Sequence, residues 1–388
     1  MMKKRFCSIL LCLFAFHLHI SAVSPPDVSA KSAVLMVADT GEIVFEKNAH
    51  EKRSMASTTK IMTALLTIEC DTPQRVVTTT PEMVNVEGTS MGLLAGDKVT
   101  FNDLVYGMLL ASGNDAANTA AISIDGSIES FALRMNKKAA QLGMKNTVFV
   151  TPSGLDDENH YSTAYDMALL ACYALQNPDF REACSSVSAK LCYGNEPYPR
   201  RLSNHNKLLN TYDGAIGIKT GFTKKSGRCL VSAAVRNGVT LVCVTLNASD
   251  DWNDHKKLLD FGFENISLKP IECKLPYITV YGGDNSEVPL ILSRQINIPV
   301  FSDSADLTYQ LKLKKYEFAP IQKNDILGYV SVLYNGKTID TVPVVADGNI
   351  KQTTQLINNR FSLINSINKF ISNITVKLKE IIKERQTA

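Results

Sequence analysis

The sequence predicts an α+β fold in which the two ends of one domain share a sheet. Runs typical of strands occur at residues 33–46 and again at 215–246, with helical periodicity between them. Strands that flank a run of helices indicate one antiparallel sheet with an inserted helical region. Residues 272–349 show short alternating runs, turn signals and no long helical period. That stretch predicts a small β-rich domain behind the first one.

The first predicted elements are a strand hairpin and a helix. Residues 33–38 are continuously apolar and residues 42–46 alternate, with the turn sequence Asp39-Thr40-Gly41 between them. From Thr58 onward, apolar residues recur on one side of a helix, which predicts a buried helical face there.

More helices and then a group of strands complete the first domain. Thr100 to Asp103 resembles a capping box ahead of apolar residues at helical spacing. Helical periodicity also covers 126–142 and 163–176. Three strands follow, at 215–220, 228–235 and 239–246, and Asn237-Gly238 is a two-residue hairpin turn between the last two.

The two ends of the chain carry segments of another kind. Residues 1–24 combine a basic start, a short apolar stretch and small residues at its exit, as a secretory signal does. An uncleaved anchor is the alternative. Isoleucines recur every seven residues from Ile357, opposite lysines and asparagines, which predicts an amphipathic helix. The expected division is residues 1–24, 25–270, 271–350 and 351–388, that is, signal, first domain, β-rich domain and amphipathic helix.

Charge and cysteine content exclude several classes of protein. The net charge of +3 becomes 0 once Lys3, Lys4 and Arg5 leave with the signal. The tail from Lys351 has seven basic residues and two glutamates, so no basic patch in the body suggests nucleic acid. Seven cysteines at irregular spacing remain, which fit neither a disulfide framework nor a zinc site. Only Cys184 and Cys192 are spaced to bridge a short loop.

The run Ser57-Thr58-Thr59-Lys60 places a hydroxyl and an amine three residues apart on one helical face. A serine hydroxyl is a weak nucleophile at neutral pH and needs a neighbouring base. A lysine can be that base when burial and nearby positive charge depress its pKa. Taken alone, this spacing is common by chance, and an exposed helix start would give it no chemical meaning.

Two further triplets give the pair a context. Ser112-Gly113-Asn114 stands where an apolar helix would end in a loop, and Lys219-Thr220-Gly221 ends a predicted strand, with Phe222 next. The three motifs, in this order and behind a secretory signal, resemble the signature of the penicillin-recognising serine hydrolases.

Within that superfamily the chain most resembles the low-molecular-weight D-alanyl-D-alanine carboxypeptidases, over about residues 30–385. The stretches that support this are 56–63, 151–157, 160–163 and 217–221. The resemblance implies a penicillin-recognising serine hydrolase domain followed by a β-rich domain and an anchoring tail. It also implies removal of the terminal D-Ala from peptidoglycan stem pentapeptides, and covalent binding of β-lactams.

The motif chemistry and the resemblance together predict a role for each side chain. Ser57 attacks the D-Ala–D-Ala amide and forms an acyl-enzyme, and Lys60 accepts its proton, with Lys219 the expected cause of a lowered Lys60 pKa. Ser112 passes a proton to the leaving amine, and Asn114 holds Lys60 and the substrate. Lys219 and Thr220 bind the terminal carboxylate. Gly221 leaves space for the substrate, and the N–H groups of Ser57 and Phe222 form the oxyanion hole.

Several assignments stay open. His205 is the nearest counterpart of an arginine that some members use for the carboxylate, and Arg228 is another basic candidate. Asp156 and Asp157 are expected to shape a loop. No metal or organic cofactor is implied, because Ser57 and Lys60 complete the nucleophile and base. The tail fits a helix on an anionic membrane surface, although a packed or coiled-coil seam has the same pattern.

Three rival functions differ in what they require. A class A-like β-lactamase needs a deacylating glutamate, and no glutamate stands in a matching loop. A non-enzymatic β-lactam-binding sensor needs a signalling span after the leader, and the sequence offers none. A D,D-endopeptidase that cuts peptidoglycan cross-links would use the same residues, and the sequence does not separate it from the carboxypeptidase.

Overall fold

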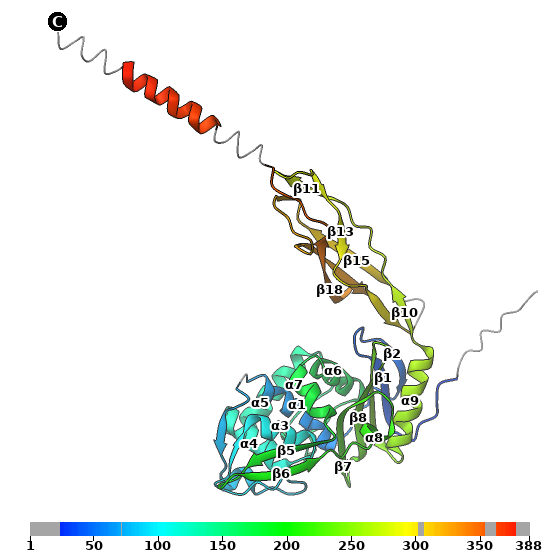
Figure 1. The fold of residues 1–388 in the computed structure, drawn as a ribbon. Coiled ribbons are helices and arrows are strands. Elements are labelled where there is room, and N and C mark those ends of the chain that lie inside the picture. Colours follow the sequence, from blue (N-terminus) through cyan, green and yellow to red (C-terminus); the bar gives the residue numbers. More distant parts are fainter. Residues whose placement is uncertain (1–23, 71, 302–305, 354–361, 378–388) are drawn as a thin grey trace, which may run out of the picture.

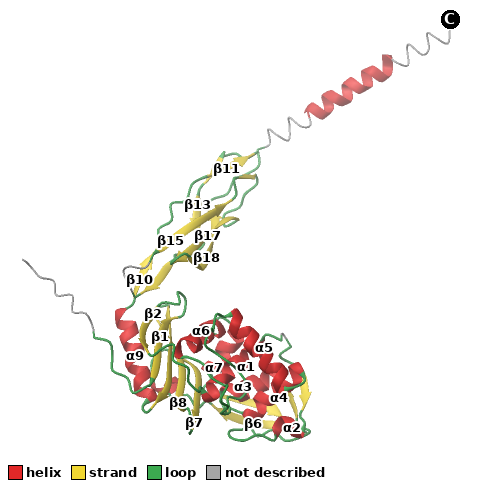
Figure 2. Ribbon diagram, turned by 180° about the vertical axis from the view of Figure 1, so that it is seen from behind, coloured by secondary structure: helices red, strands yellow, loops and turns green. Residues whose placement is uncertain are grey.

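The computed structural model describes residues 24–70, 72–301, 306–353 and 362–377. An α+β domain is followed by an elongated β-rich domain, and Figures 1 and 2 show the two from opposite sides. The expected secretory signal lies outside the described residues, as do Ile357 and Leu378 of the tail repeat.

A five-stranded antiparallel sheet forms the centre of the first domain, in the order β2-β1-β9-β8-β7. The strands are β1 Ser32–Val37, β2 Ile43–Lys47, β7 Ala215–Thr223, β8 Gly227–Arg236 and β9 Val239–Ala248. The pairing of β1 with β9 confirms the prediction that the two ends of the domain share a sheet. The turns at Gly41 and at Asn237-Gly238 also match, since all three residues have positive φ.

The position of β1 in the sheet explains why its residues 33–37 are all apolar. Val34 and Met36 face the large core under the helices, whereas Ala33, Leu35 and Val37 face a second core. Helix α9, Asp251–Asn265, covers that second face with Leu258 and Leu259. The large helical region lies on the opposite face, so β1 is buried on both sides (Figure 2).

The helical region contains both expected and unexpected elements. The helices are η1 Ala56–Thr59, α1 Lys60–Ile68, α2 Pro81–Val84, α3 Phe101–Leu109, α4 Asn114–Asp125, α5 Ile128–Gln141, α6 Ala164–Ala174, α7 Pro178–Ser185 and α8 Leu208–Thr211. Two pairs of short antiparallel strands accompany them. Strand β3 Val76–Thr78 lies beside β4 Lys98–Thr100, with α2 between them in the sequence, and β5 Ser188–Tyr193 forms a hairpin with β6 Tyr198–Ser203. Thr100 and Asp103 form the predicted capping box at α3. The sequence reasoning missed α2, α4, α7, α8 and α9.

The β-rich domain has its own buried core, as the alternating sequence predicts. Its sheets run β10-β14, β12-β11-β16 and β13-β18-β17-β15. The strands are β10 Ser267–Pro270, β11 Ile278–Tyr281, β12 Glu287–Val288, β13 Leu290–Leu292, β14 Asn297–Val300, β15 Leu307–Leu313, β16 Tyr316–Phe318, β17 Ile326–Tyr334 and β18 Lys337–Ala346. Asn335-Gly336 turns β17 into β18 with positive φ at both residues.

Two further expectations concern the cysteines and the tail. Cys184 is buried in α7 and Cys192 is exposed on β5, and both are free thiols, so the bridge considered between them is wrong. Residues 362–377 form a helix with exposed side chains throughout. Within the described ranges, no helix has the length and apolarity needed to cross a bilayer.

Candidate active site

The sequence pair Ser57 and Lys60 sits where a tight turn becomes a helix. Ser57 lies in η1 and Lys60 is the first residue of α1, so the two side chains stand three residues apart on one face. Ala56, just before the serine, has φ +48, an uncommon value for a residue with a Cβ. Ser57 is partly exposed, whereas the Lys60 side chain is fully buried.

The Lys60 amine has three close oxygen partners. Its Nζ lies 3.0 Å from Ser57 Oγ, 2.6 Å from Asn114 Oδ1 and 2.7 Å from the Ser153 carbonyl oxygen. The last two oxygens can only accept hydrogen bonds, whereas the serine hydroxyl can also donate one. A neutral amine therefore fits this site with its two N–H groups on Asn114 and Ser153 and its lone pair toward the Ser57 hydroxyl.

Asn114 is fixed so that its oxygen faces the amine. Its Nδ2 donates to the Glu87 carbonyl oxygen at 2.6 Å, which leaves Oδ1 for Lys60. Its backbone N–H donates to the Thr89 carbonyl oxygen at 2.8 Å. The start of α4 therefore delivers the amide in one orientation, and the predicted contact between Asn114 and Lys60 is present.

Burial is the main reason why the Lys60 amine favours its neutral form. Desolvation lowers the pKa of Lys60 well below its ordinary value, the positive charge of Lys219 lowers it further, and Asp115 opposes both. The sequence reasoning named Lys219 as the cause. Lys219 does contribute, but its effect is second to burial, because the sequence could not show that the amine is completely enclosed.

Ser112 lines the same cleft in a strained conformation. Its φ is +60, and its carbonyl oxygen accepts a hydrogen bond from the Thr89 hydroxyl at 2.6 Å. The next residue, Gly113, donates its N–H to the Gly107 carbonyl oxygen at 3.0 Å. These two bonds hold a backbone geometry that costs on the order of 1–3 kcal/mol and that clusters at functional sites.

Edge strand β7 supplies the third motif. The Lys219 side chain is buried, its Nζ donates to the Thr220 carbonyl oxygen at 2.8 Å, and burial lowers the pKa of Lys219 to about 7. A Cβ at Gly221 would lie 3.1 Å from the Ser57 backbone nitrogen, so this glycine also lets β7 pack against η1. Phe222 is 67% exposed.

A cleft of about 850 Å³ brings the motifs together. Its lining includes Ser57, Ser112, Asn114, Thr220, Gly221 and Phe222. The two buried lysines stand behind this lining rather than in it. All eight predicted site residues therefore belong to one cleft and the shell directly behind it.

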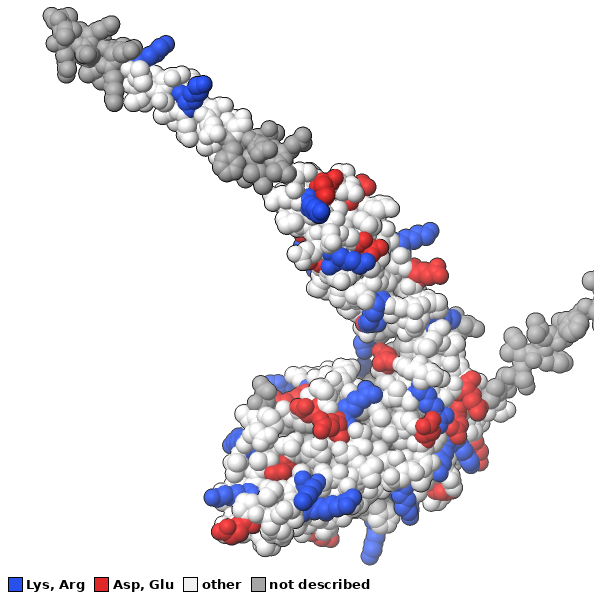
Figure 3. Space-filling view, in the orientation of Figure 1, with Lys and Arg blue, Asp and Glu red and all other residues white. Residues whose placement is uncertain are grey.

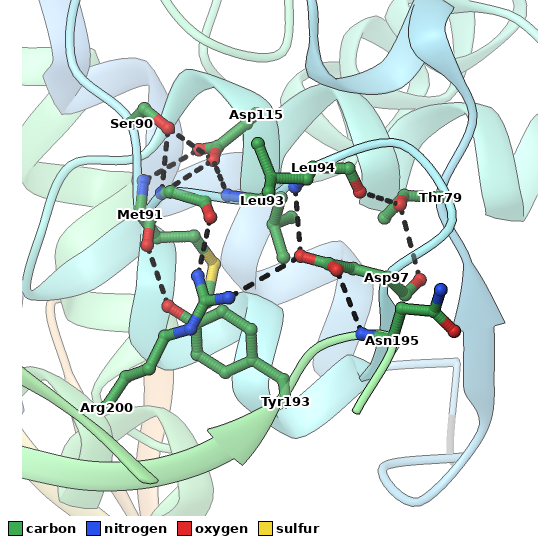
Figure 4. A network of polar contacts seen from close by, with 11 residues as sticks. Thr79, Ser90, Met91, Leu93, Leu94, Asp97, Asp115, Tyr193, Asn195 and Arg200 are labelled. Carbon is green, nitrogen blue, oxygen red and sulfur yellow. Dashed lines mark hydrogen bonds and ion pairs between the residues drawn. The ribbon is translucent and has the colours of Figure 1, made fainter. Parts of the chain in front are cut away.

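Sequence reasoning missed Asp115, whose buried carboxylate organises one wall of the cleft (Figure 4). It accepts backbone N–H groups from Met91 at 2.9 Å, Gly92 at 3.1 Å and Leu93 at 2.9 Å. It also accepts the Ser90 hydroxyl at 2.5 Å. This carboxylate therefore fixes the loop that includes Glu87 and Thr89, which in turn hold Asn114 and Ser112.

The β5–β6 hairpin holds the same loop from the other side. Tyr193 donates its hydroxyl to the Met91 carbonyl oxygen at 2.7 Å, and Arg200 donates to the Gly92 carbonyl oxygen at 2.5 Å. Arg200 also lies 3.7 Å from the Asp97 carboxylate. Figure 4 shows these side chains reaching the loop opposite Asp115.

The segment after α5 positions the Ser153 carbonyl oxygen. His160 accepts the Val150 N–H on Nδ1 at 3.0 Å, so its Nε2 carries the proton and donates to Thr59 Oγ1 at 2.8 Å. Gly154 has φ +85, and a Cβ there would lie 2.0 Å from the Ala56 carbonyl oxygen. Residues 151–157 therefore contribute to the site through the Ser153 carbonyl oxygen and through their close packing against η1.

The remaining candidates take structural or peripheral places. Asp156 accepts hydroxyls from Ser54 at 3.1 Å and Thr223 at 3.0 Å, and Asp157 accepts the Asn159 N–H, so both shape loops as expected. Arg228 and His205 line the cleft. Arg228 lies 3.4 Å from Asp251, while burial, and then Lys219, lower the pKa of His205.

Two family models and several known proteins match the chain. Residues 19–250 match the family described as D-alanyl-D-alanine carboxypeptidase, Peptidase_S11. Residues 263–352 match the one described as Penicillin-binding protein 5, C-terminal domain. The D-alanyl-D-alanine carboxypeptidase DacF of Bacillus subtilis is 34% identical over 336 residues, which cover 83% of this chain and 86% of that protein. DacC of Escherichia coli is 33% identical, with 85% and 86% covered.

Two solved structures show the same fold. Penicillin-binding protein 5 from Haemophilus influenzae aligns with a TM-score of 0.61 and 28% identity, over 85% of this chain and 100% of that one. The Streptomyces K15 DD-transpeptidase aligns with a TM-score of 0.59 and 31% identity, over 62% of this chain and 100% of that one.

The Asp115 carboxylate gives a first prediction. In Asp115→Asn an amide N–H₂ faces the backbone N–H donors of the loop, so we expect a loss of about 2 kcal/mol in the free energy of unfolding. We also expect the acylation rate by penicillin to fall at least about tenfold, because Ser112 and Asn114 lose their support. Denaturant titration and stopped-flow acylation, at a temperature where the variant is folded, measure the two effects.

The matched control is Asp125→Asn on the same helix. Asp125 ion-pairs with Arg134 at the surface, and such pairs contribute about 1 kcal/mol or less. Equal acylation rates in the two variants would show that Asp115 does not position the site.

Proposed function

The chain belongs to the peptidase S11 family of serine-type D-alanyl-D-alanine carboxypeptidases, and we propose how its own residues divide that reaction among them. It is a penicillin-binding protein whose substrates are peptides that end in D-Ala-D-Ala. One observation carries the assignment of roles: the buried Lys60 amine has two acceptor-only oxygens and one serine hydroxyl around it.

Ser57 is the nucleophile and Lys60 the general base. Ser57 Oγ forms a bond to the carbonyl carbon of the penultimate D-Ala, and its proton moves to the Lys60 lone pair. The C–N bond then breaks, and the proton passes through Ser112 to the leaving D-Ala amine. Water hydrolyses the resulting ester by the reverse proton path, which releases the shortened peptide and restores Ser57.

Lys219 and Thr220 bind the terminal carboxylate of the substrate. A lysine with a pKa of about 7 is only partly charged in the empty site, and an incoming carboxylate stabilises its charged form. We place Lys219 ahead of the two other basic candidates, because Arg228 already contacts Asp251 and His205 favours its neutral form.

The backbone N–H groups of Ser57 and Phe222 form the oxyanion hole of this proposal. Gly221 supports it, because its lack of a Cβ brings β7 close to the Ser57 nitrogen. A β-lactam carbonyl occupies the same place and acylates Ser57, and the ester persists because the opened ring stays attached. The proposed substrate is the stem pentapeptide of peptidoglycan, and the reaction needs no cofactor.

The tail helix is the proposed membrane attachment of an exported enzyme. Within residues 362–377, one face carries Leu363, Ile364, Ile367, Phe370, Ile371 and Ile374, all exposed. This stretch has two lysines and no acidic residue, and Figure 3 shows only white and blue atoms on it. Such a helix lies in the headgroup region of an anionic leaflet. We propose export through residues 1–24 and a peripheral place on the outer face of the cytoplasmic membrane.

Penicillin labelling tests the nucleophile. We expect mass spectrometry to find one β-lactam adduct on the wild type, none on Ser57→Ala, and an unchanged adduct on the surface control Ser130→Ala. The wild type should release D-Ala from a pentapeptide, and Ser57→Ala should not. An adduct that survives in Ser57→Ala would refute the assignment.

Cell fractionation tests the attachment. We expect a chain without residues 355–388 to leave the membrane fraction while it still binds penicillin. In the full chain, Ile367→Asp with Ile371→Asp should have the same effect, whereas Asn365→Asp with Asn368→Asp on the polar face should have a much smaller one. Unchanged membrane association of the deletion would contradict the proposal.

A further inference from the structure

Three aromatic rings cluster on the surface of the β-rich domain. Tyr281, Tyr316 and Phe318 are 54%, 53% and 62% exposed. Their ring centroids are 5.6 Å apart for Tyr281 and Tyr316, 6.0 Å for Tyr281 and Phe318, and 5.8 Å for Tyr316 and Phe318. The three rings therefore contact one another rather than the core, and we call them the aromatic cluster.

Strand register places the aromatic cluster on the outer face of a small sheet. Strands β11 and β16 pair in parallel, with Tyr281 opposite Phe318 and Thr279 opposite Tyr316. Val280, between the two outward positions of β11, is 4% exposed and belongs to the domain core. Because side chains alternate between the inner and outer faces of the sheet, the three large rings lie on the face that is exposed to solvent. Contiguous exposed apolar groups of this kind usually mark an interaction surface.

The chain leaves the β-rich domain beside this cluster. Thr353 donates its N–H to the Gly282 carbonyl oxygen at 2.9 Å, and Asp284 donates to the Lys351 carbonyl oxygen at 2.8 Å. Gly282 is the neighbour of Tyr281 in the sequence. In Figure 1, β11 lies at the end of the β-rich domain farthest from the α+β domain. The exit point and the aromatic cluster therefore share one tip of the molecule.

Chain length ties that tip to the tail helix. Residues 354–361 separate Thr353 from the helix at 362–377, and a segment of this length spans at most roughly 30 Å. A tail helix that lies on a membrane therefore keeps the aromatic cluster within roughly 30 Å of the lipid surface. The cluster can therefore reach the membrane–water interface, where tyrosine is enriched because its ring is apolar and its hydroxyl stays in the polar layer.

We propose that Tyr281, Tyr316 and Phe318 form a second membrane contact, whose rings enter the headgroup layer of an anionic leaflet. Lys315, next to Tyr316, is exposed and lies beside the headgroups in this arrangement, whereas Lys314 pairs with Glu317. The inference rests on the proposed attachment through the tail helix. A single tether would let the enzyme turn freely, whereas two contacts fix the tip on the membrane. The β-rich domain then sets how far the cleft of the α+β domain stands from the lipid.

The test measures binding of the full chain to vesicles of 70% phosphatidylcholine and 30% phosphatidylglycerol. We expect the triple variant Tyr281→Ser, Tyr316→Ser, Phe318→Ser to bind about tenfold more weakly than the wild type. Its acylation by penicillin should not change, because the cleft lies in the other domain. The control Leu133→Ser, Val187→Ser, Leu268→Ser removes exposed apolar side chains elsewhere and should leave vesicle binding unchanged.

A conservative variant protects the test against misfolding. The chain has one tryptophan, and Phe318→Trp adds a second. Subtracting the fluorescence spectrum of the wild type from that of the variant gives the emission of the added tryptophan. We expect brominated lipids to quench that added emission on vesicles.

The outcomes separate the two proposals. If the triple variant binds vesicles as tightly as the wild type, the aromatic contact is overturned. The same holds if brominated lipids do not quench the added emission of vesicle-bound Phe318→Trp. Neither result bears on the tail attachment. A full chain that does not bind vesicles at all overturns the tail attachment as well. Wild-type dimerisation that the triple variant abolishes would identify a second copy as the occupant and would also overturn the proposal.

Discussion

The enclosed amine of Lys60 is the constraint on which the rest of the α+β domain depends. An ammonium in this place would lose its hydration, so burial favours the neutral amine. Four segments far apart in the sequence meet to enclose it. Turn η1 brings the hydroxyl, α4 brings the Asn114 amide, the segment after α5 brings the Ser153 carbonyl, and β7 brings a second buried cation.

The protonation states of the two buried lysines are linked. A charged Lys219 disfavours a charged Lys60, so the site favours a neutral Lys60 as long as Lys219 is charged, whereas the pKa of Lys219 itself is lowered by burial. In the proposed mechanism, a bound substrate carboxylate favours the charged form of Lys219. Behind the cleft, the hydrogen bonds of Asp115 and His160 keep the partners of Lys60 in place.

The sequence alone could predict the parts of this site that lie in short motifs or clear periodicities. Strands β1 and β7, the capping box at Thr100 and the eight predicted residues that the fold brings to one cleft and the shell behind it all follow from such patterns or from the family resemblance. Helix α4 does not, because its buried face is made of small alanines, which give a weaker hydrophobic signal than leucine, isoleucine or methionine. Asp115 and the Ser153 carbonyl act through backbone groups of distant loops, which leave no local pattern. That burial lowers the pKa of Lys60 more than Lys219 does could not be predicted from the sequence either. The residues next to Lys60 in the chain do not show that distant segments enclose its amine.

The pH dependence of acylation by penicillin tests the central claim, that a neutral Lys60 is the base. For the wild type we predict that the second-order rate rises with pH in a step centred well below 10.5, the ordinary lysine value, and falls on the alkaline side as Lys219, with a pKa of about 7, loses its charge. In Lys219→Met the removed positive charge no longer disfavours the Lys60 cation, so the pKa of Lys60 rises and the step moves to higher pH. The pH at the midpoint of the rising step is the quantity to compare between the two proteins. The maximum rate is not, because in Lys219→Met it also reflects weaker carboxylate binding. A wild-type step near 10.5, or a midpoint that stays or falls in Lys219→Met, would contradict this account.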